Sequence, residues 1–131
     1  TFTLEDNIYL PLVLAGKSHK EMQERLKPIA AQLGITELLK KYPYEVSGGQ
    51  KQRAAVARAL ITNPKLILAD EPTGNLDTQN SSEVIALLKE ASKKYEQTII
   101  MITHNRSIAQ TADRVLQVSD GNLTDFGRCR E

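Results

Sequence analysis

Two adjacent carboxylates follow a short apolar run in the middle of the chain. Asp70 and Glu71 come directly after residues 66–69, and His104 directly follows a second apolar run, residues 98–103. If both runs are buried parallel strands, their carboxyl ends lie at one edge of the sheet, where open α/β sheets bind ligands. Adjacent like charges need a cation or a proton to coexist. We therefore expect Asp70 to bind magnesium and Glu71 to be the base that orients an attacking water.

The residue after Glu71 bears on how its carboxylate is aimed. Pro72 disfavours a helical backbone at Glu71, which predicts that the chain stays extended there. The alternative is that these polar side chains are ordinary solvated residues at strand ends, and the sequence leaves this alternative open for His104 taken alone.

A second group of residues has the composition of a phosphate site. Ser47-Gly48-Gly49 supplies backbone amides without side chains at the start of a helix, where the helix dipole favours an anion. A Ser-Gly-Gly run alone is most often a simple turn. Here Gln50 and a basic, alanine-rich helix follow it, which favours a phosphate site.

The rest of the sequence predicts the elements that position these residues. Capping patterns, apolar periodicity and turn residues predict helices over residues 4–14, 18–34, 36–41, 47–62, 77–95 and 106–112, strands over 66–69 and 98–103, and a hairpin over 114–126. Pro11 and Pro28 fall inside two of these helices, and Pro11 is expected to kink or shorten the first. The strand–helix–strand unit predicts parallel strands, buried on both faces. A soft boundary near residue 63 separates a helical part from an α/β part.

Composition narrows the function classes. The 131 residues are 40% hydrophobic and 25% charged, which is ordinary for one globular domain with a modest core. A net charge of +1 gives no electrostatic footprint for nucleic acid. No apolar run is long enough to cross a bilayer, and the single cysteine, Cys129, rules out an internal disulfide.

Three motifs together resemble the ATPase subunit of an ABC transporter. They are Val-Ser-Gly-Gly-Gln-Lys-Gln-Arg, then Leu-Ile-Leu-Ala-Asp-Glu-Pro-Thr-Gly-Asn-Leu-Asp, then Ile-Thr-His, in the family's order and spacing. The resemblance implies an α/β, partial P-loop NTPase fold, with a helical subdomain at residues 1–62 and part of the nucleotide-hydrolysing core at residues 63–131. The stretch around Glu71–Asp77 is most similar to the branch for lipoprotein release, macrolide export and antimicrobial-peptide resistance.

The resemblance also implies roles for individual residues. Ser47 to Gln50 match the signature motif, which contacts the γ-phosphate of ATP held by the opposite subunit. Asp70 matches the Walker B aspartate that binds Mg²⁺, and Glu71 matches the catalytic glutamate. Asp77 matches the D-loop aspartate at the dimer interface. His104 matches the switch histidine that senses the γ-phosphate, and Asn105 stands where the family commonly has Asp, a change that we expect to be tolerated.

A complete P-loop, Gly-x-x-x-x-Gly-Lys-Ser/Thr, is missing from the sequence. Gly16-Lys17-Ser18 matches only its end, because Pro11 stands at the first glycine position and has no amide hydrogen; Ser18 is better explained as a helix cap. Because the chain starts without methionine in a helical pattern, we expect it to be a fragment. Alone it is expected neither to bind ATP tightly nor to hydrolyse it.

The resemblance implies the partners and the location as well. It implies a second ATPase subunit, an integral membrane permease, no nucleic acid, and a cytoplasmic position on the inner face of a cell membrane, in a bacterium. The strand bearing the P-loop would lie between the strands before His104 and after Arg114, so unpaired strand edges and self-association are expected. Two alternatives stay open: a non-catalytic module that docks a permease, and an ABC ATPase of DNA repair or chromosome organisation. The absence of sustained heptads and of zinc-ligand clusters argues against the latter.

Overall fold

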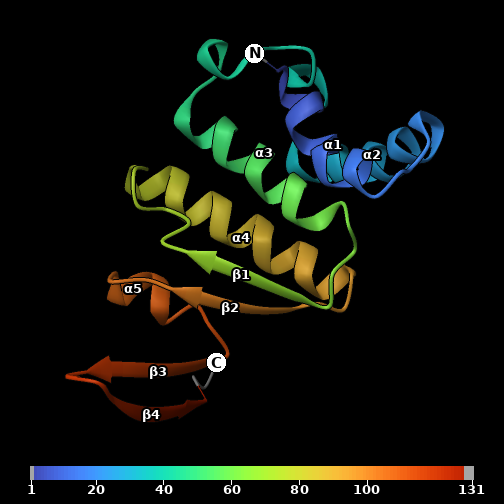
Figure 1. Cartoon of the computed structure of the whole chain (residues 1–131). Helices are drawn as coiled ribbons and strands as arrows, with labels where there is room; N and C mark the ends of the chain where they lie inside the picture. The colour runs from blue at the N-terminus through green and yellow to red at the C-terminus, as the bar shows by residue number, and fades with distance from the viewer. Residues whose placement is uncertain (1, 129–131) are drawn as a thin grey trace.

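The computed structural model describes residues 2–128, and Cys129 lies outside them. Along this part of the chain, a helical first half is followed by two small sheets with two further helices (Figure 1). The helices are α1 (Leu4–Leu14), α2 (His19–Leu33), α3 (Gly48–Leu60), α4 (Thr78–Lys94) and α5 (Arg106–Ala109), with 3-10 turns η1 (Thr36–Leu38) and η2 (Pro43–Glu45). The strands are β1 (Leu66–Asp70), β2 (Thr98–Ile102), β3 (Arg114–Ser119) and β4 (Asn122–Arg128).

The helices begin where the sequence predicts caps. The Thr3 hydroxyl accepts from the Asp6 amide, and the Asp6 carboxylate accepts from the Thr3 amide, which makes a full capping box. Ser18 accepts from the Glu21 amide at 3.3 Å, so Ser18 is a helix cap and not part of a P-loop. The expectation that Pro11 shortens α1 is wrong, because the helix continues through it to Leu14.

Prolines are tolerated in α1 and α2 because tertiary packing outweighs one lost backbone hydrogen bond. Ile8 and Leu12 of α1 are 0% and 2% exposed, so the helix is fixed by burial on both sides of Pro11. The predicted helix over residues 36–41 is reduced to the 3-10 turn η1. Its cap residue is Ile35, and no side chain caps it.

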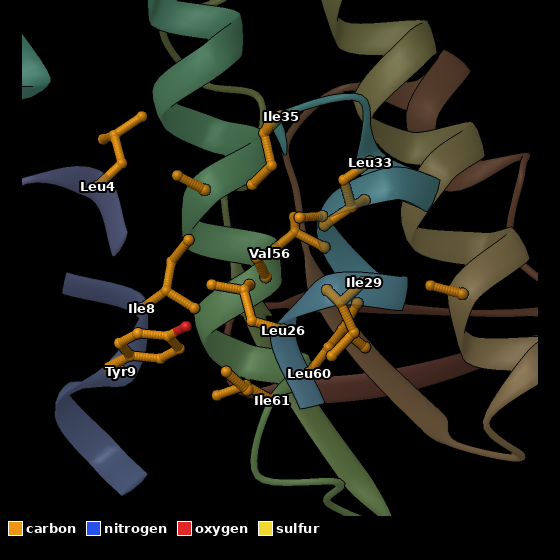
Figure 2. Packing of buried hydrophobic residues seen from close by; sticks show 14 of the residues in the cluster. Leu4, Ile8, Tyr9, Leu26, Ile29, Leu33, Ile35, Val56, Leu60 and Ile61 are labelled. Atoms are coloured by element: carbon orange, nitrogen blue, oxygen red, sulfur yellow. The ribbon is translucent and has the colours of Figure 1, made fainter. Parts of the chain in front are cut away.

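One apolar core joins the helices to the first sheet. Figure 2 shows residues of α1, α2 and α3 meeting in this cluster. Ile67 of β1 and Val84 and Leu88 of α4 belong to the same cluster, so burial is continuous across residue 63. The boundary near residue 63 stays a prediction, since a single apolar cluster contains residues from both sides of it.

The strands β1 and β2 pair in parallel, as the strand–helix–strand pattern predicts. Their register runs from Leu66 opposite Thr98 to Asp70 opposite Ile102. Figure 1 shows α4 between α3 and this sheet, so α4 covers one sheet face.

The expectation that both strands are buried on both faces is wrong. Alternate residues are exposed, with Leu68 74% and Ile100 54% accessible. The physical reason is that, within residues 2–128, helices cover the face of Ile67 but no element covers the opposite face. Both faces of β1 and β2 are therefore apolar, but only one of them is covered within residues 2–128.

The hairpin β3–β4 forms a separate antiparallel sheet (Figure 1). Its turn places Asp120 and Gly121 at φ of 49° and 77°, which suits the tight turn of a two-residue hairpin. An Arg114–Asp125 ion pair joins the two strands. Among the described residues no ladder joins β2 to β3, in keeping with the expected unpaired edges.

Among the helices of residues 2–128, none is both long enough and apolar enough to cross a membrane.

Replacement of Tyr9 should change the alkaline stability of the protein. Burial and the neighbouring Glu5 carboxylate raise the pKa of Tyr9 from 10.0 to about 12. The fold thus favours the neutral phenol, and this contribution is complete below pH 10 and is lost as the pH rises toward 12. We expect the free energy of unfolding of Tyr9→Phe, from urea titrations, to fall less over this range than that of the wild type.

The matched control is Tyr44→Phe, because the Tyr44 side chain is 75% exposed. Tyr44→Phe should keep the wild-type pH dependence. If the free energy of unfolding falls equally with pH in Tyr9→Phe and in the wild type, Tyr9 is not the group that causes the alkaline loss of stability.

Candidate functional site

Glu71 and His104 lie in contact at the carboxyl ends of β1 and β2. The Glu71 amide donates to the Ile102 carbonyl at 2.8 Å, which extends the parallel ladder by one bond. Glu71 Oε1 then accepts from the His104 amide at 3.0 Å and lies 3.4 Å from His104 Nε2. The sequence predicts this meeting of side chains; their chemical roles stay predictions.

The backbone of Glu71 differs from the expected extended conformation. Its φ is +46°, in the left-handed region that non-glycine residues seldom occupy. Two hydrogen bonds hold it there: its amide binds Ile102, and its carbonyl accepts from the Gly74 amide at 3.1 Å. The requirement to end the ladder and begin a tight turn overrides the preference that Pro72 imposes. Strained backbone of this kind gathers at functional sites.

Asp70 occupies the same sheet edge without joining the Glu71–His104 contact. It is the last residue of β1, opposite Ile102, and its side chain is exposed on the uncovered sheet face. Within residues 2–128 no hydrogen bond or ion pair engages its carboxylate, and no group of three or more His, Cys, Asp and Glu side chains is arranged to hold a metal ion. The Asp70 carboxylate is therefore available to an external group.

The two sides of the Glu71–His104 contact differ in exposure. The His104 side chain is 96% exposed and that of Glu71 36%. Asn105 fixes the chain just beyond, because its Oδ1 accepts from the Ser107 and Ile108 amides at 2.9 and 3.2 Å and caps α5. Asp and Asn are both good caps, which explains how Asn is accommodated at this position.

A cleft of about 810 Å³ opens beside this contact. Glu71, Thr103 and His104 form one part of its wall, and α4 from Thr78 to Lys89 and α5 form others. Hydroxyl side chains line it, among them Ser81, Ser82 and Ser107. The cleft gives water and small polar groups access to the Glu71 carboxylate.

The α3 N-terminus has the geometry predicted for an anion site. Ser47 Oγ accepts from the Gln50 amide at 3.2 Å, and Gln50 Oε1 accepts from the Ser47 amide at 2.9 Å, a reciprocal capping box. The Gly48 and Gly49 amides precede Lys51, whose amide is the first to donate within the helix, at 2.9 Å to the Ser47 carbonyl; in the described part of the chain no group accepts from either glycine amide. Unpaired amides at the positive end of a helix favour an anion.

The two glycines have different surroundings. A Cβ on Gly48 would lie 3.5 Å from Leu76 Cδ2, an ordinary contact, and Gly48 is exposed. A Cβ on Gly49 would lie 2.8 Å from Asn80 Oδ1, and Gly49 is buried. Only Gly48 is thus open to an incoming group, while Gly49 is required by close packing on α4.

Asp77 caps α4, as its position predicts. Asp77 Oδ1 accepts from the Asn80 amide at 2.8 Å, and Oδ2 accepts from Asn80 Nδ2 at 3.0 Å. The sequence predicts a helix that begins at residue 77, but it does not predict the approach of Asn80 to Gly49. The position of Asn80 near the start of a predicted helix gives no information about Gly49, which lies 31 residues earlier in the sequence.

Comparison with known proteins identifies the family. The profile described as ABC transporter matches residues 1–74. The chain belongs to the ABC transporter family. This ABC chain is 44% identical, over 94% of its length, to the bacitracin export ATP-binding protein BceA of Halalkalibacterium halodurans and covers 49% of that protein. It is 42% identical, over 93% of its length, to the lipoprotein-releasing system ATP-binding protein LolD of Legionella pneumophila and covers 54% of it.

Solved structures agree with this assignment. The ABC chain is similar to the ATP-binding cassette MJ0796 in a dimeric post-hydrolysis state bound to ADP and Pi, with a TM-score of 0.78, 30% identity, and coverage of 99% of this chain and 58% of that one. The predicted class, an α/β chain with part of a P-loop NTPase fold, is confirmed. The chain spans about a third to about half of the length of the curated relatives, from 34% to 56%.

Loss of the α3 cap should destabilise the protein by a predictable amount. Ser47→Ala removes the acceptor of the Gln50 amide, so the free energy of unfolding should fall by about 1 kcal/mol. Urea unfolding followed by circular dichroism measures the change. Ser47→Thr keeps the hydroxyl and should remain near the wild type; an Ala variant as stable as the Thr variant would contradict the cap.

Proposed function

We propose that this chain is the signature-to-switch portion of an ATP-hydrolysing subunit of an ABC transporter. The observation that supports this most directly is the contact between Glu71 and His104, which brings a carboxylate and an exposed imidazole from two parallel strand ends to one cleft. Phosphoryl transfer to water needs such positioned groups and little covalent chemistry from the protein.

The residues at the sheet edge fit a magnesium ion accompanied by a phosphate substrate. Mg²⁺ is usually bound by one or two carboxylates together with substrate phosphates and waters, so a cage of three side chains is not needed. Asp70 would hold the ion, and its carboxylate is free for this in the described residues. When bound, the ion neutralises phosphate charge.

Glu71 has the role of a base in this proposal. Its left-handed backbone turns the side chain from the strand toward the His104 amide and the cleft. The carboxylate orients a water for attack on the γ-phosphorus of ATP and accepts its proton, while the bond from that phosphorus to the bridging oxygen breaks and ADP leaves. His104, whose side chain is 96% exposed, contacts the terminal phosphate from the same edge.

The α3 N-terminus serves a different nucleotide, held by a second ATPase subunit. Its open Gly48 amide and its capped first turn suit a terminal phosphate. The related cassette MJ0796 is described as a dimer bound to ADP and Pi, which supports pairing of two such subunits. Asp77 lies exposed beside this turn and belongs to the same interface.

The membrane partner in this proposal is an integral permease, with the ATPase subunit at the inner face of the membrane. Relatives are named for bacitracin export, lipoprotein release and methionine import, so neither cargo nor direction is assigned. Leu10, Val13 and Leu14 form one exposed apolar face of α1, 41%, 53% and 81% accessible. This face favours a second candidate function, a module that docks the permease without catalysis. Copurification with a permease without nucleotide, but no ATPase activity after assembly, would support that candidate.

Nucleotide chemistry tests the main proposal. The 131-residue chain alone should show neither ATP hydrolysis nor micromolar ATP affinity by calorimetry, because its sequence has no P-loop amides and lysine. Joined to a P-loop segment from a relative such as BceA, it should hydrolyse ATP. In that assembly Glu71→Gln should lower kcat by about 10²–10⁴-fold, the range for loss of a general base.

The control for this test is Glu90→Gln, a change of the same kind at an exposed position of α4. It should leave kcat unchanged. Micromolar ATP binding by the chain alone would contradict the expectation that ATP binding needs the P-loop. Wild-type activity of Glu71→Gln would overturn the role of Glu71.

The uncovered sheet face should make the isolated chain self-associate. Leu66, Leu68, Ile100 and Ile102 lie on this face and are 48–74% exposed, and contiguous exposed apolar groups promote association. Light scattering at high concentration should show oligomers that Leu68→Thr/Ile100→Thr reduces. Leu14→Thr, on α1, is the control, and a wild-type chain that stays monomeric would contradict the proposal.

A further inference from the structure

Asn80 connects the first turn of α4 to the first turn of α3. Its amide and its Nδ2 donate to the two carboxylate oxygens of Asp77, at 2.8 and 3.0 Å. With Nδ2 engaged in this way, Asn80 Oδ1 is the atom that faces Gly49. The Asn80 side chain is therefore fixed on one side by the Asp77 cap and on the other by the α3 backbone.

Any side chain at Gly49 would force the Asn80 side chain to move. A Cβ there would lie 2.8 Å from Asn80 Oδ1 and 3.2 Å from Asn80 Cγ. A Cβ on the neighbouring Gly48 would lie an ordinary 3.5 Å from Cδ2 of Leu76, the residue just before Asp77. The Asp77 turn thus lies beside both glycines of the α3 N-terminus.

A second contact lies farther along the same two helices. Arg53 Nη2 donates to Glu83 Oε2 at 2.7 Å. Arg53 is four residues after Gly49 and Glu83 is three residues after Asn80, so the two contacts are separated by about 6 Å along α3 and about 4.5 Å along α4. Both contacts lie beside the apolar core that α3 and α4 share, and together with it they fix the orientation of α3 on α4.

We propose that Asn80 is a positioning residue that holds the α3 N-terminus and the Asp77 turn of one subunit in fixed register. The proposal rests on the function proposed above, in which both groups face the nucleotide of a second subunit. Removing Asn80 would leave each group folded, since Ser47 still caps α3 and Asp77 still caps α4. The relative placement of the two groups would no longer be fixed at this end.

A double-mutant cycle on the 131-residue chain tests the contact itself. Gly49→Ala places a methyl against Asn80 and should lower the folding equilibrium constant about tenfold or more in urea titrations. In the Asn80→Ala background the same change should cost less than threefold, because the opposing atoms are gone. Gly48→Ala is the matched control and should cost less than threefold in either background. Additive effects of Gly49→Ala and Asn80→Ala would overturn the proposal.

Kinetics of the assembled ATPase test the positioning role. Asn80→Ala should lower kcat about tenfold while the KM for ATP stays within threefold, because the P-loop that binds nucleotide is untouched. Ser18→Ala, which removes the distant α2 cap at a similar cost in stability, should change neither constant. Equal kinetic losses in both variants would mean that Asn80 contributes stability alone and would overturn the positioning role.

The two proposals fail in different ways. An assembled wild-type enzyme without ATPase activity would count against the proposed function, and the cycle on the isolated chain would still decide the Asn80–Gly49 contact. If the assembled wild type is active but the effects of Gly49→Ala and Asn80→Ala on stability are additive, the proposed function stands and the positioning role of Asn80 does not.

Discussion

The packing of α4 is the constraint on which the rest of the structure depends. Val84 and Leu88 are 1% and 4% exposed and join the helical core to β1, and α4 lies between α3 and the sheet (Figure 1). Its first turn contacts the α3 N-terminus, and the β1–α4 loop that leads into it begins at Glu71. One helix therefore determines where the α3 N-terminus and the Glu71 carboxylate stand relative to each other, without a direct bond between them.

The Glu71–His104 contact shows how a short segment is held against its local preference. Glu71 is followed by Pro72 yet adopts a left-handed backbone, because the ladder bond to Ile102 and the turn bond to Gly74 both act on it. A non-glycine residue in this region costs of order 1–3 kcal/mol. That cost persists only where surrounding bonds over-determine the position, which is the case at the end of β1.

Local signals let the sequence predict several parts of the site. The helices over residues 47–62 and 77–95 begin where the sequence predicts, and there Ser47 and Asp77 accept from the Gln50 and Asn80 amides. The meeting of Glu71 and His104 follows from parallel pairing alone. Two features escaped prediction, the uncovered face of Leu68 and the contact of Asn80 with Gly49. Both depend on what lies across the fold, and neither a strand pattern nor a cap position contains that information.

The two glycines of α3 show why a motif cannot be assigned a single physical role. A run of two glycines suggests that both are needed for backbone approach to a ligand. Here the exposed Gly48 leaves its amide open, whereas the buried Gly49 is required by Asn80 on the neighbouring helix. The open amide of Gly48 and the close packing of Gly49 against Asn80 are thus separate features of two adjacent residues. Because the packing partner belongs to the Asp77 turn, the Gly49 requirement also limits how far that turn moves relative to the Gly48 amide.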